Sequence, residues 1–238
     1  MKILVLQHER VEHPGIFRRF LAEDGHEMLA VELDEGETPP PLDGFDALWV
    51  LGGPMDVWQE AEHPWLAAEK RLIREAVAER GLPYLGLCLG HQLLAEALGG
   101  AVGPGTPEIG IMEVQLTEDG ASGVFLDGLP ERFSCLQWHS AEITRLPAGA
   151  QVLATSPACA VQAMRWGNRA HSVQFHLEIE ADTVASWARI PAYAAALERA
   201  MGPGGAARLE AEAAAQMEAF NAMAERIYIN WLQTAAGA

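Results

Sequence analysis

The segment GLCLG at residues 86–90 constrains the fold of this chain more than any other stretch. The apolar run before it, Leu82–Leu85, is typical of a buried strand, and residues 90–98 after it carry apolar side chains at helical spacing until Gly99-Gly100 ends the pattern. A cysteine between two glycines at such a junction predicts a strand, a sharp turn and a helix, because only small residues fit where strand and helix crowd the turn. The segment therefore indicates an α/β fold with Cys88 at the tip of the turn.

Strands and helices are expected to alternate on both sides of this segment. The patterns predict strands over residues 1–7, 27–32 and 47–51, and helices over residues 15–21 and 64–80. Such alternation favours a mostly parallel sheet, doubly wound with helices on both faces, whose site lies at the carboxyl ends of the strands. Residues 110–175 are more strand-rich and less regular. We expect a single domain over residues 1–200.

A Gly/Pro-rich break at residues 201–205 precedes a C-terminal helical extension, residues 201–238. Its apolar side chains recur at steps of three and four residues: Leu209, Ala213, Met217, Phe220, Met223, Ile227 and Trp231. We expect this stripe to pack on the same domain, while a homodimer or partner contact is the alternative that the stripe leaves open.

Cys88 is interpreted as a nucleophile because backbone N–H groups and the helix dipole at a helix N-terminus favour a thiolate. A buried structural cysteine is the alternative. The nucleophile needs a base and an orienting group, and residues 170–178 are typical of a strand that ends in His176-x-Glu178. Alternation along a strand places these two side chains on one face, where the carboxylate can orient the imidazole. The three residues together predict a Cys-His-Glu catalytic triad.

Four blocks together resemble a known family: LGGPM at 51–55, GLCLGHQ at 86–92, WHS at 138–140 followed by Leu146-Pro147, and VQFHLE at 173–178. In this order they resemble the class I (triad-type) glutamine amidotransferases, most closely the glutaminase part of GMP synthase and the stand-alone proteins similar to it. The resemblance covers about residues 1–180. It implies a flavodoxin-like class I glutaminase fold and a cysteine-dependent hydrolase.

The resemblance also implies roles for individual residues. Cys88 would be the nucleophile, His176 the base and Glu178 its orienting group, with an oxyanion hole made by the backbone N–H groups of Gly53 and Leu89. The residues that would bind substrate are Gln92, His139 and Ser140.

Two positions depart from the family pattern. Leu177 stands where the family usually has proline, but the spacing of His176 and Glu178 is kept. Ser140-Ala141 replaces the Gly-Asp pair of the GMP synthase pattern, in the segment that grips the α-amino and α-carboxylate groups of the substrate. A looser grip there fits a γ-glutamyl compound better than glutamine itself.

The leading functional hypothesis is hydrolysis of a γ-carboxamide through a cysteinyl thioester, with ammonia released for a separate acceptor or synthetase protein. A stand-alone γ-glutamyl peptidase or hydrolase is the alternative, and a catalytically idle regulatory or binding subunit is a third hypothesis. The sequence has no P-loop, no dinucleotide fingerprint and no ATP-pyrophosphatase signature, so we expect a glutaminase half without a synthetase and without a cofactor.

Composition narrows the choice of partners and of compartment. The formal net charge of −17 argues against nucleic acid and anionic membranes as partners, and no apolar run is long enough to cross a bilayer. An odd count of three cysteines and an N-terminus without a signal-peptide cleavage site favour the cytoplasm. No metal is expected, because His8 and His13 miss the zinc-protease spacing by one residue and would diverge on a helix.

Overall fold

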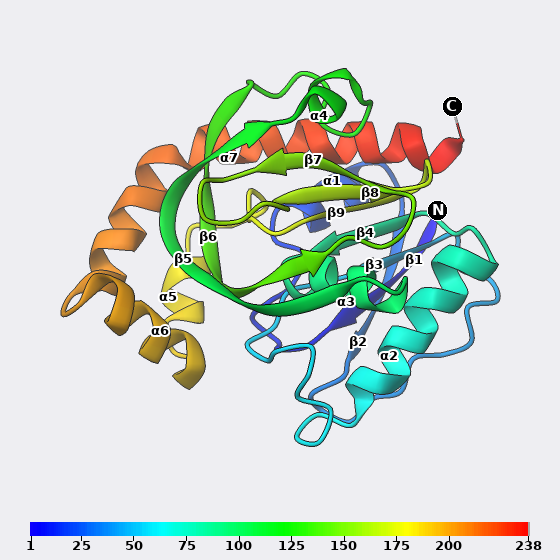
Figure 1. Cartoon of the computed structure of the whole chain (residues 1–238), viewed down its shortest axis with the longest axis horizontal. Helices are drawn as coiled ribbons and strands as arrows, with labels where there is room; N and C mark the ends of the chain where they lie inside the picture. Colours follow the sequence, from blue (N-terminus) through cyan, green and yellow to red (C-terminus); the bar gives the residue numbers. More distant parts are fainter. Residues whose placement is uncertain (238) are drawn as a thin grey trace.

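Residues 1–237 are described by a computed structural model, in which nine strands form one sheet in the order β2-β1-β3-β4-β9-β8-β7-β5-β6 (Figure 1). The strands are β1 (Lys2–Gln7), β2 (Glu27–Glu32), β3 (Ala47–Val50), β4 (Tyr84–Leu87), β5 (Ala101–Leu116), β6 (Arg132–Arg145), β7 (Ala150–Thr155), β8 (Ala163–Trp166) and β9 (Ala170–Val173). The helices are α1 (Phe17–Glu23), α2 (Trp65–Arg74), the π-helix η1 (Glu75–Glu79), α3 (Leu89–Ala97), α4 (Glu118–Ser122), α5 (Thr183–Trp187), α6 (Pro191–Met201) and α7 (Gly205–Ala236).

Strands β2, β1, β3, β4 and β9 are parallel neighbours. All four residues of β3 are buried, as expected for a parallel strand that is covered on both faces. Two hydrophobic clusters flank these strands: Trp49 and Phe17 belong to one, and Leu48 and Leu93 to the other. Helices α1 and α7 contribute to the first cluster, and α2 and α3 to the second. The predicted α/β fold with helices on both faces is confirmed.

The other half of the sheet is antiparallel, with β8, β7, β5 and β6 following β9. This is the region whose sequence is strand-rich and less regular. Its longest strands, β5 and β6, pair along most of their length and curve together around one edge of the molecule (Figure 1). The sheet is therefore mixed, and β6 passes close to the carboxyl ends of the parallel strands through a bridge between Leu136 and His176.

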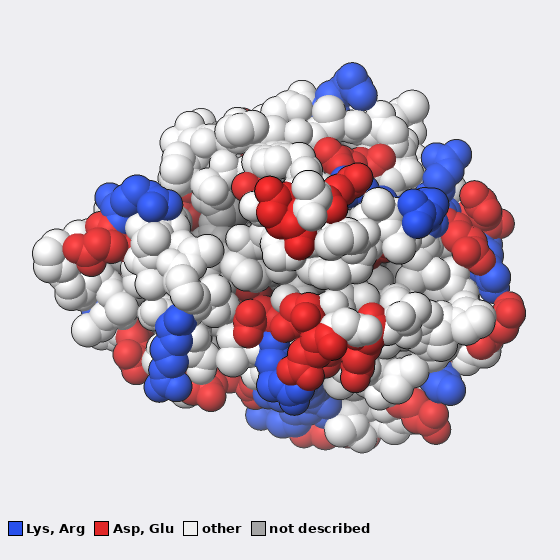
Figure 2. All heavy atoms as spheres, turned by 90° about the horizontal axis from the view of Figure 1, so that it is seen from below, with Lys and Arg blue, Asp and Glu red and all other residues white. Residues whose placement is uncertain are grey.

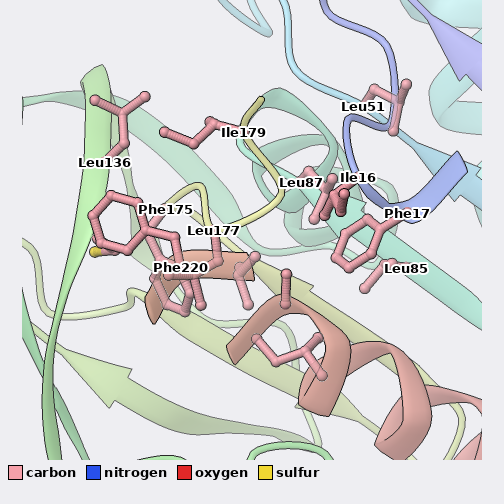
Figure 3. Packing of buried hydrophobic residues seen from close by; sticks show 14 of the residues in the cluster. Ile16, Phe17, Leu51, Leu85, Leu87, Leu136, Phe175, Leu177, Ile179 and Phe220 are labelled. Atoms are coloured by element: carbon pink, nitrogen blue, oxygen red, sulfur yellow. The ribbon is translucent and has the colours of Figure 1, made fainter. Parts of the chain in front are cut away.

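Helix α7 packs on helices α1, α5 and α6 and on the sheet. The stripe residues Leu209, Phe220 and Trp231 are buried in the same cluster as α1 and β3. The Trp231 indole N–H donates to the carbonyl of Tyr84 at 3.1 Å, and its ring meets the edge of Trp49 with the ring centroids 5.1 Å apart. Figure 3 shows Phe220 beside Phe175 and Leu177, which come from the segment that follows β9. The terminal helix thus supports both the parallel strands and this segment.

The surface is acidic but mixed in charge. On the face shown in Figure 2, acidic side chains form several groups with basic side chains among them. Among the described residues, no helix combines the length and the apolar character that crossing a membrane requires.

Candidate active site

Cys88 lies between the end of β4 and the start of α3. Its backbone has φ 51° and ψ −103°, and within residues 1–237 it is the only non-glycine residue with a positive φ. Its N–H donates to the carbonyl of Val173 at 2.9 Å, which ties the turn to the neighbouring β9. Strained backbone of this kind is costly and concentrates at functional sites, so the geometry of Cys88 agrees with the strand-turn-helix predicted from the sequence.

The two glycines that flank Cys88 have no room for a side chain. A Cβ on Gly86 would lie 2.7 Å from the carbonyl oxygen of Gly90, and a Cβ on Gly90 would lie 2.0 Å from the carbonyl oxygen of Val50. Backbone atoms of β3 and α3 cannot move aside as a flexible side chain can. These contacts are the physical reason for the Gly-x-Cys-x-Gly spacing.

His176 is held by a different strand from the one that the sequence predicts. Strand β9 ends at Val173 rather than continuing to Glu178, because the chain turns there to pair with β6. The N–H of His176 donates to the Leu136 carbonyl at 2.9 Å, and the Leu136 N–H donates to the His176 carbonyl at 3.1 Å. This isolated bridge fixes the backbone of His176 beside the parallel strands.

The His176 and Glu178 side chains form a buried pair. Nδ1 of His176 lies 2.6 Å from Glu178 Oε1, and Glu178 Oε2 accepts the N–H of Leu177 at 3.0 Å. With Nδ1 donating to the carboxylate, Nε2 of the neutral ring is left to accept a proton. Burial lowers the pKa of His176, but the Glu178 carboxylate and the interaction with Cys88 outweigh burial and raise this pKa well above its ordinary value. The pair therefore suits a base that takes a proton from a thiol.

Two glutamines connect Cys88 to the opposite wall of the site. The Gln174 amide donates to Cys88 Sγ at 3.4 Å, and its oxygen accepts from Gln92 Nε2 at 3.0 Å. Gln92 Nε2 also donates to the carbonyl of Ala141 at 3.2 Å. The nitrogen of Gln92, which the family resemblance assigns to substrate binding, is thus engaged with protein atoms, and its oxygen remains for a ligand.

A cavity of about 50 Å³ opens over Cys88. Six of the eight predicted site residues line it: Gly53, Cys88, Leu89, Gln92, His139 and Ser140. His176 and Glu178 are not among the lining residues and are almost fully buried. Asp56 is the one carboxylate among the described residues that line the cavity, and burial raises its pKa.

Gly53 and Leu89 lie next to each other at this cavity. A Cβ on Gly53 would come within 2.8 Å of the Leu89 side chain, so Gly53 permits a close approach that a larger residue would prevent. Leu89 is the first residue of α3, where an N–H has no carbonyl partner inside the helix. Both residues line the same cavity as Cys88.

The comparisons with known proteins agree with this geometry. The family model described as "Glutamine amidotransferase class-I" matches residues 17–185. The chain belongs to the class I glutamine amidotransferases. Its relatives include the glutamine amidotransferase-like protein YfeJ of Salmonella typhimurium, which is 33% identical over 189 residues (77% of this chain and 78% of YfeJ). The glutamine-hydrolysing GMP synthase of Sulfolobus acidocaldarius has a subunit that is 33% identical over 155 residues (64% of this chain and 78% of that subunit).

Solved structures show the same relationship. A glutamine amidotransferase from Thermotoga maritima superposes with a TM-score of 0.85 at 28% identity, covering 99% of this chain and 98% of that one. A glutamine amidotransferase from Methylobacillus flagellatus gives a TM-score of 0.86 at 27% identity, covering 98% of this chain and 94% of that one. The amidotransferase fold therefore includes α7 as well as the region that the family model matches.

A second polar cluster supports one wall of this class I amidotransferase site. Ligand atoms of Glu108, His139 and Cys159 lie within 4.8 Å of one another, close enough to hold a metal ion. Glu108 already accepts hydrogen bonds from Ser156 at 2.8 Å and from Gln162 at 2.7 Å. Burial raises the pKa of the Cys159 thiol to about 12, which makes it a poor source of thiolate. Because Glu108 is already engaged by protein donors and Cys159 holds its proton, these three residues are a poor set of metal ligands.

His8 and His13, which the sequence places close together, bind different partners in the structure. His8 contacts the Gly52 carbonyl and Glu69, whereas His13 Nδ1 accepts the N–H of Gly15. Sequence reasoning missed the contacts of His8 and also missed Gln174. Gln174 lies two residues before His176, but its link to Gln92 depends on a long-range contact with α3.

Proposed function

We propose that this chain is a glutaminase that hydrolyses the γ-carboxamide of glutamine through a thioester on Cys88 and delivers ammonia to an acceptor on another protein. The observation that carries the proposal is the position of Cys88. Cys88 lines a cavity together with Gly53 and Leu89, and His176 is paired with Glu178 in the protein interior. This combination supports Cys88 as the nucleophile, His176 as its base and Glu178 as the group that orients the base.

In the proposed reaction, His176 takes the thiol proton of Cys88, and the sulfur attacks the γ-carbonyl carbon. The carbonyl oxygen becomes an oxyanion that accepts hydrogen bonds from the N–H groups of Gly53 and Leu89. Each such donor typically lowers a barrier by about 3–4 kcal/mol. When the C–N bond breaks, His176 gives its proton to the leaving ammonia and the thioester remains on Cys88. Water then attacks the thioester, His176 accepts its proton, and glutamate leaves as the thiol is restored.

The lining of the cavity supports a substrate with a free α-amino group. Asp56 places a carboxylate at the cavity, and carboxylates bind ammonium groups. We propose that Asp56 takes over the role of the aspartate that Ala141 replaces in this chain. Gln92, His139 and Ser140 complete the proposed contacts with the rest of the amino acid.

The relatives support delivery of ammonia to a partner. One of them is named as one subunit of a glutamine-hydrolysing GMP synthase, and the name implies a further subunit. The chain itself carries no nucleotide-binding or ATP-pyrophosphatase signature. We therefore propose that the ammonia acceptor is bound by a separate synthetase.

The second candidate is a γ-glutamyl peptidase or hydrolase. It is favoured by Ala141, which removes a carboxylate from the substrate-binding segment, and by Ser140, which is exposed beside the cavity and leaves space for a larger leaving group. Such an enzyme would act through the same thioester, but an amine or a peptide would leave in place of ammonia.

A substrate panel separates the two candidates. Purified protein is given glutamine, a γ-glutamyl dipeptide and a γ-glutamyl amine, and glutamate and amine release are measured, with Cys88→Ala as the control. We expect slow glutamine hydrolysis that Cys88→Ala abolishes. Rapid turnover of the γ-glutamyl peptide, with glutamine a poor substrate, would establish the peptidase instead. If none of the three is hydrolysed, the proposed function is wrong for the isolated chain.

A further inference from the structure

We propose that His8 and Glu69 are positioning residues that hold the Gly52–Gly53 peptide in the orientation that directs the Gly53 N–H toward the cavity over Cys88. This inference rests on the proposed function, because it concerns the oxyanion hole of that reaction. Neither residue lines the cavity, so the pair acts through the backbone and not on the substrate.

His8 bridges the glycine loop and helix α2. Its Nδ1 lies 2.7 Å from the carbonyl oxygen of Gly52, and its Nε2 lies 2.8 Å from Glu69 Oε1. A carbonyl oxygen can only accept, so Nδ1 carries a proton, and the carboxylate of Glu69 accepts from Nε2. With both nitrogens donating, the ring is an imidazolium paired with Glu69.

The surroundings hold this ring in place. The His8 side chain is fully buried and Glu69 is 2% exposed. The Trp65 ring stacks on His8 with the centroids 5.4 Å apart, one turn before Glu69 on the same helix. Burial alone would lower the pKa of His8, but Glu69 and the Gly52 carbonyl outweigh burial and raise it. His8 is thus a fixed, charged donor and not a freely rotating side chain.

The geometry of a peptide connects this contact to the oxyanion hole. No described peptide bond is cis, and in a trans peptide the C=O and the N–H point in opposite directions. When His8 holds the Gly52 oxygen on one side, the Gly53 N–H is directed to the other side. Gly53 lines the cavity together with Cys88 and Leu89.

A glycine pair needs such a restraint. Glycines rotate easily, so the Gly52–Gly53 peptide would otherwise flip at little cost and turn its N–H out of the site. A flip in this protein would leave the Nδ1–H of a buried imidazolium without an acceptor, which is strongly unfavourable. We infer that the charge on His8, supplied by Glu69, strengthens the restraint, because hydrogen bonds from charged donors are stronger than those from neutral ones.

The test uses His8→Leu, which removes the donor, and His8→Gln, which keeps an N–H donor on a side chain of similar reach. Asn230→Leu is the matched control, since Asn230 is also buried and donates to backbone carbonyls, those of Phe125 and Asp127, away from the cavity. Four quantities are measured for each variant: kcat and KM for glutamine, the rate of Cys88 alkylation by iodoacetamide, and the Tm. Alkylation of the thiolate needs no oxyanion hole.

For His8→Leu we expect kcat to fall about 10²- to 10³-fold, as for the loss of one oxyanion donor, with KM and the alkylation rate within about threefold of wild type. His8→Gln should recover part of the lost kcat, and Asn230→Leu should lower the Tm without this loss. If kcat falls no further in His8→Leu than in Asn230→Leu, or if alkylation slows in parallel with kcat, the positioning role is wrong.

Glu69→Gln gives a second variant should His8→Leu fail to fold. It neutralises the pair and keeps a hydrogen-bonding side chain, and we expect a smaller kcat loss of about tenfold. A crystal structure of a His8 or Glu69 variant tests the proposal even if the wild type hydrolyses no glutamine, which would contradict the proposed function alone. A Gly52 carbonyl turned toward the cavity supports the proposal, whereas an unchanged peptide in every variant overturns it.

Discussion

The hydroxyl of Tyr193 donates a hydrogen bond to Glu12 Oε1, in the protein interior next to the site. Tyr193 lines the cavity over Cys88, whereas Oε2 of Glu12 is buried without a hydrogen-bond partner among the described residues. A Cβ on Gly52 would lie 2.0 Å from Glu12 Oε2 and 3.6 Å from His176 Cε1, so both side chains meet at this glycine. Burial raises the pKa of Glu12 to about 7, although Tyr193 and His176 act to lower it.

The raised pKa predicts an unusual pH dependence of stability. The folded state favours the protonated form of Glu12. The stability that Glu12 contributes to the fold is therefore complete below pH 4.5, the ordinary pKa of a glutamate, and is lost as the pH rises through about 7. The loss is on the order of 3 kcal/mol. Glu12→Gln stays neutral, and we expect its free energy of unfolding to exceed that of wild type at pH 8 by a margin that disappears near pH 5. Urea unfolding at both pH values measures this, with Glu210→Gln on the surface of α7 as the control; equal gains for the two variants would contradict the prediction.

The proposed triad predicts how much activity remains when each of its three residues is replaced. Cys88→Ala should abolish thioester formation, and His176→Asn should nearly do so. Glu178→Gln should keep more activity, because an orienting group contributes less than the nucleophile or the base, with a kcat loss of about 10²- to 10⁴-fold. Its amide can accept from only one of the two N–H groups that Glu178 binds, those of His176 and Leu177. Glutamine hydrolysis by folded variants measures the order. A Glu178→Gln protein as inactive as Cys88→Ala would give Glu178 more than an orienting role.

Selective labelling should distinguish Cys88 from the other cysteines. Burial raises the pKa of Cys135 well above its ordinary value and that of Cys159 to about 12, whereas Cys88 lines the cavity. We expect a glutamine-like diazo-ketone to modify Cys88 and to spare Cys135 and Cys159. Peptide mapping by mass spectrometry identifies the labelled residue. Label found mainly on Cys135 or Cys159 in folded protein would count against the proposed nucleophile.

Gly90→Ala should destabilise the whole fold. The new Cβ would lie 2.0 Å from the carbonyl oxygen of Val50, so β3 and α3 would have to separate. We expect the free energy of unfolding to fall by about 3 kcal/mol. Gly103→Ala on β5 is the matched control, because its new Cβ would meet only the end of the Thr144 side chain, at 3.3 Å. Similar losses in the two variants would show that the close approach at Gly90 is unimportant.

The proposed contact of Asp56 with the substrate predicts that replacing Asp56 weakens substrate binding. If its carboxylate holds the α-ammonium group, Asp56→Asn should raise KM for glutamine about tenfold and leave the alkylation rate of Cys88 unchanged. Ser140→Ala, at the exposed side of the cavity, should change KM less. Steady-state kinetics with glutamine and with a glutamine analogue lacking the α-amino group measure the effect. The role is excluded if Asp56→Asn weakens both substrates equally.

The parts of the fold that depend on local pattern were predictable from the sequence. The turn at Cys88 follows from two glycines between an apolar run and a helical pattern, and the structure has this turn. The end of β9 was predicted wrongly, because the alternation of apolar and polar residues continues to Glu178 and hides the switch of pairing from β4 to β6. The contacts of His8 with Gly52 and Glu69 were not predictable, since they join residues 44 and 61 positions apart and have no local signature.

The contact of Trp231 with Tyr84 has a consequence for how the protein forms in the cell. Ribosomes synthesise a chain from its N-terminus, and β4 lies well before the middle of the sequence. Until α7 has emerged from the ribosome, the face of β3 and β4 that Trp231 covers remains exposed to water. The nascent chain therefore carries an uncovered apolar surface while some 150 further residues are being added, and chaperones that recognise such surfaces have this interval in which to bind it.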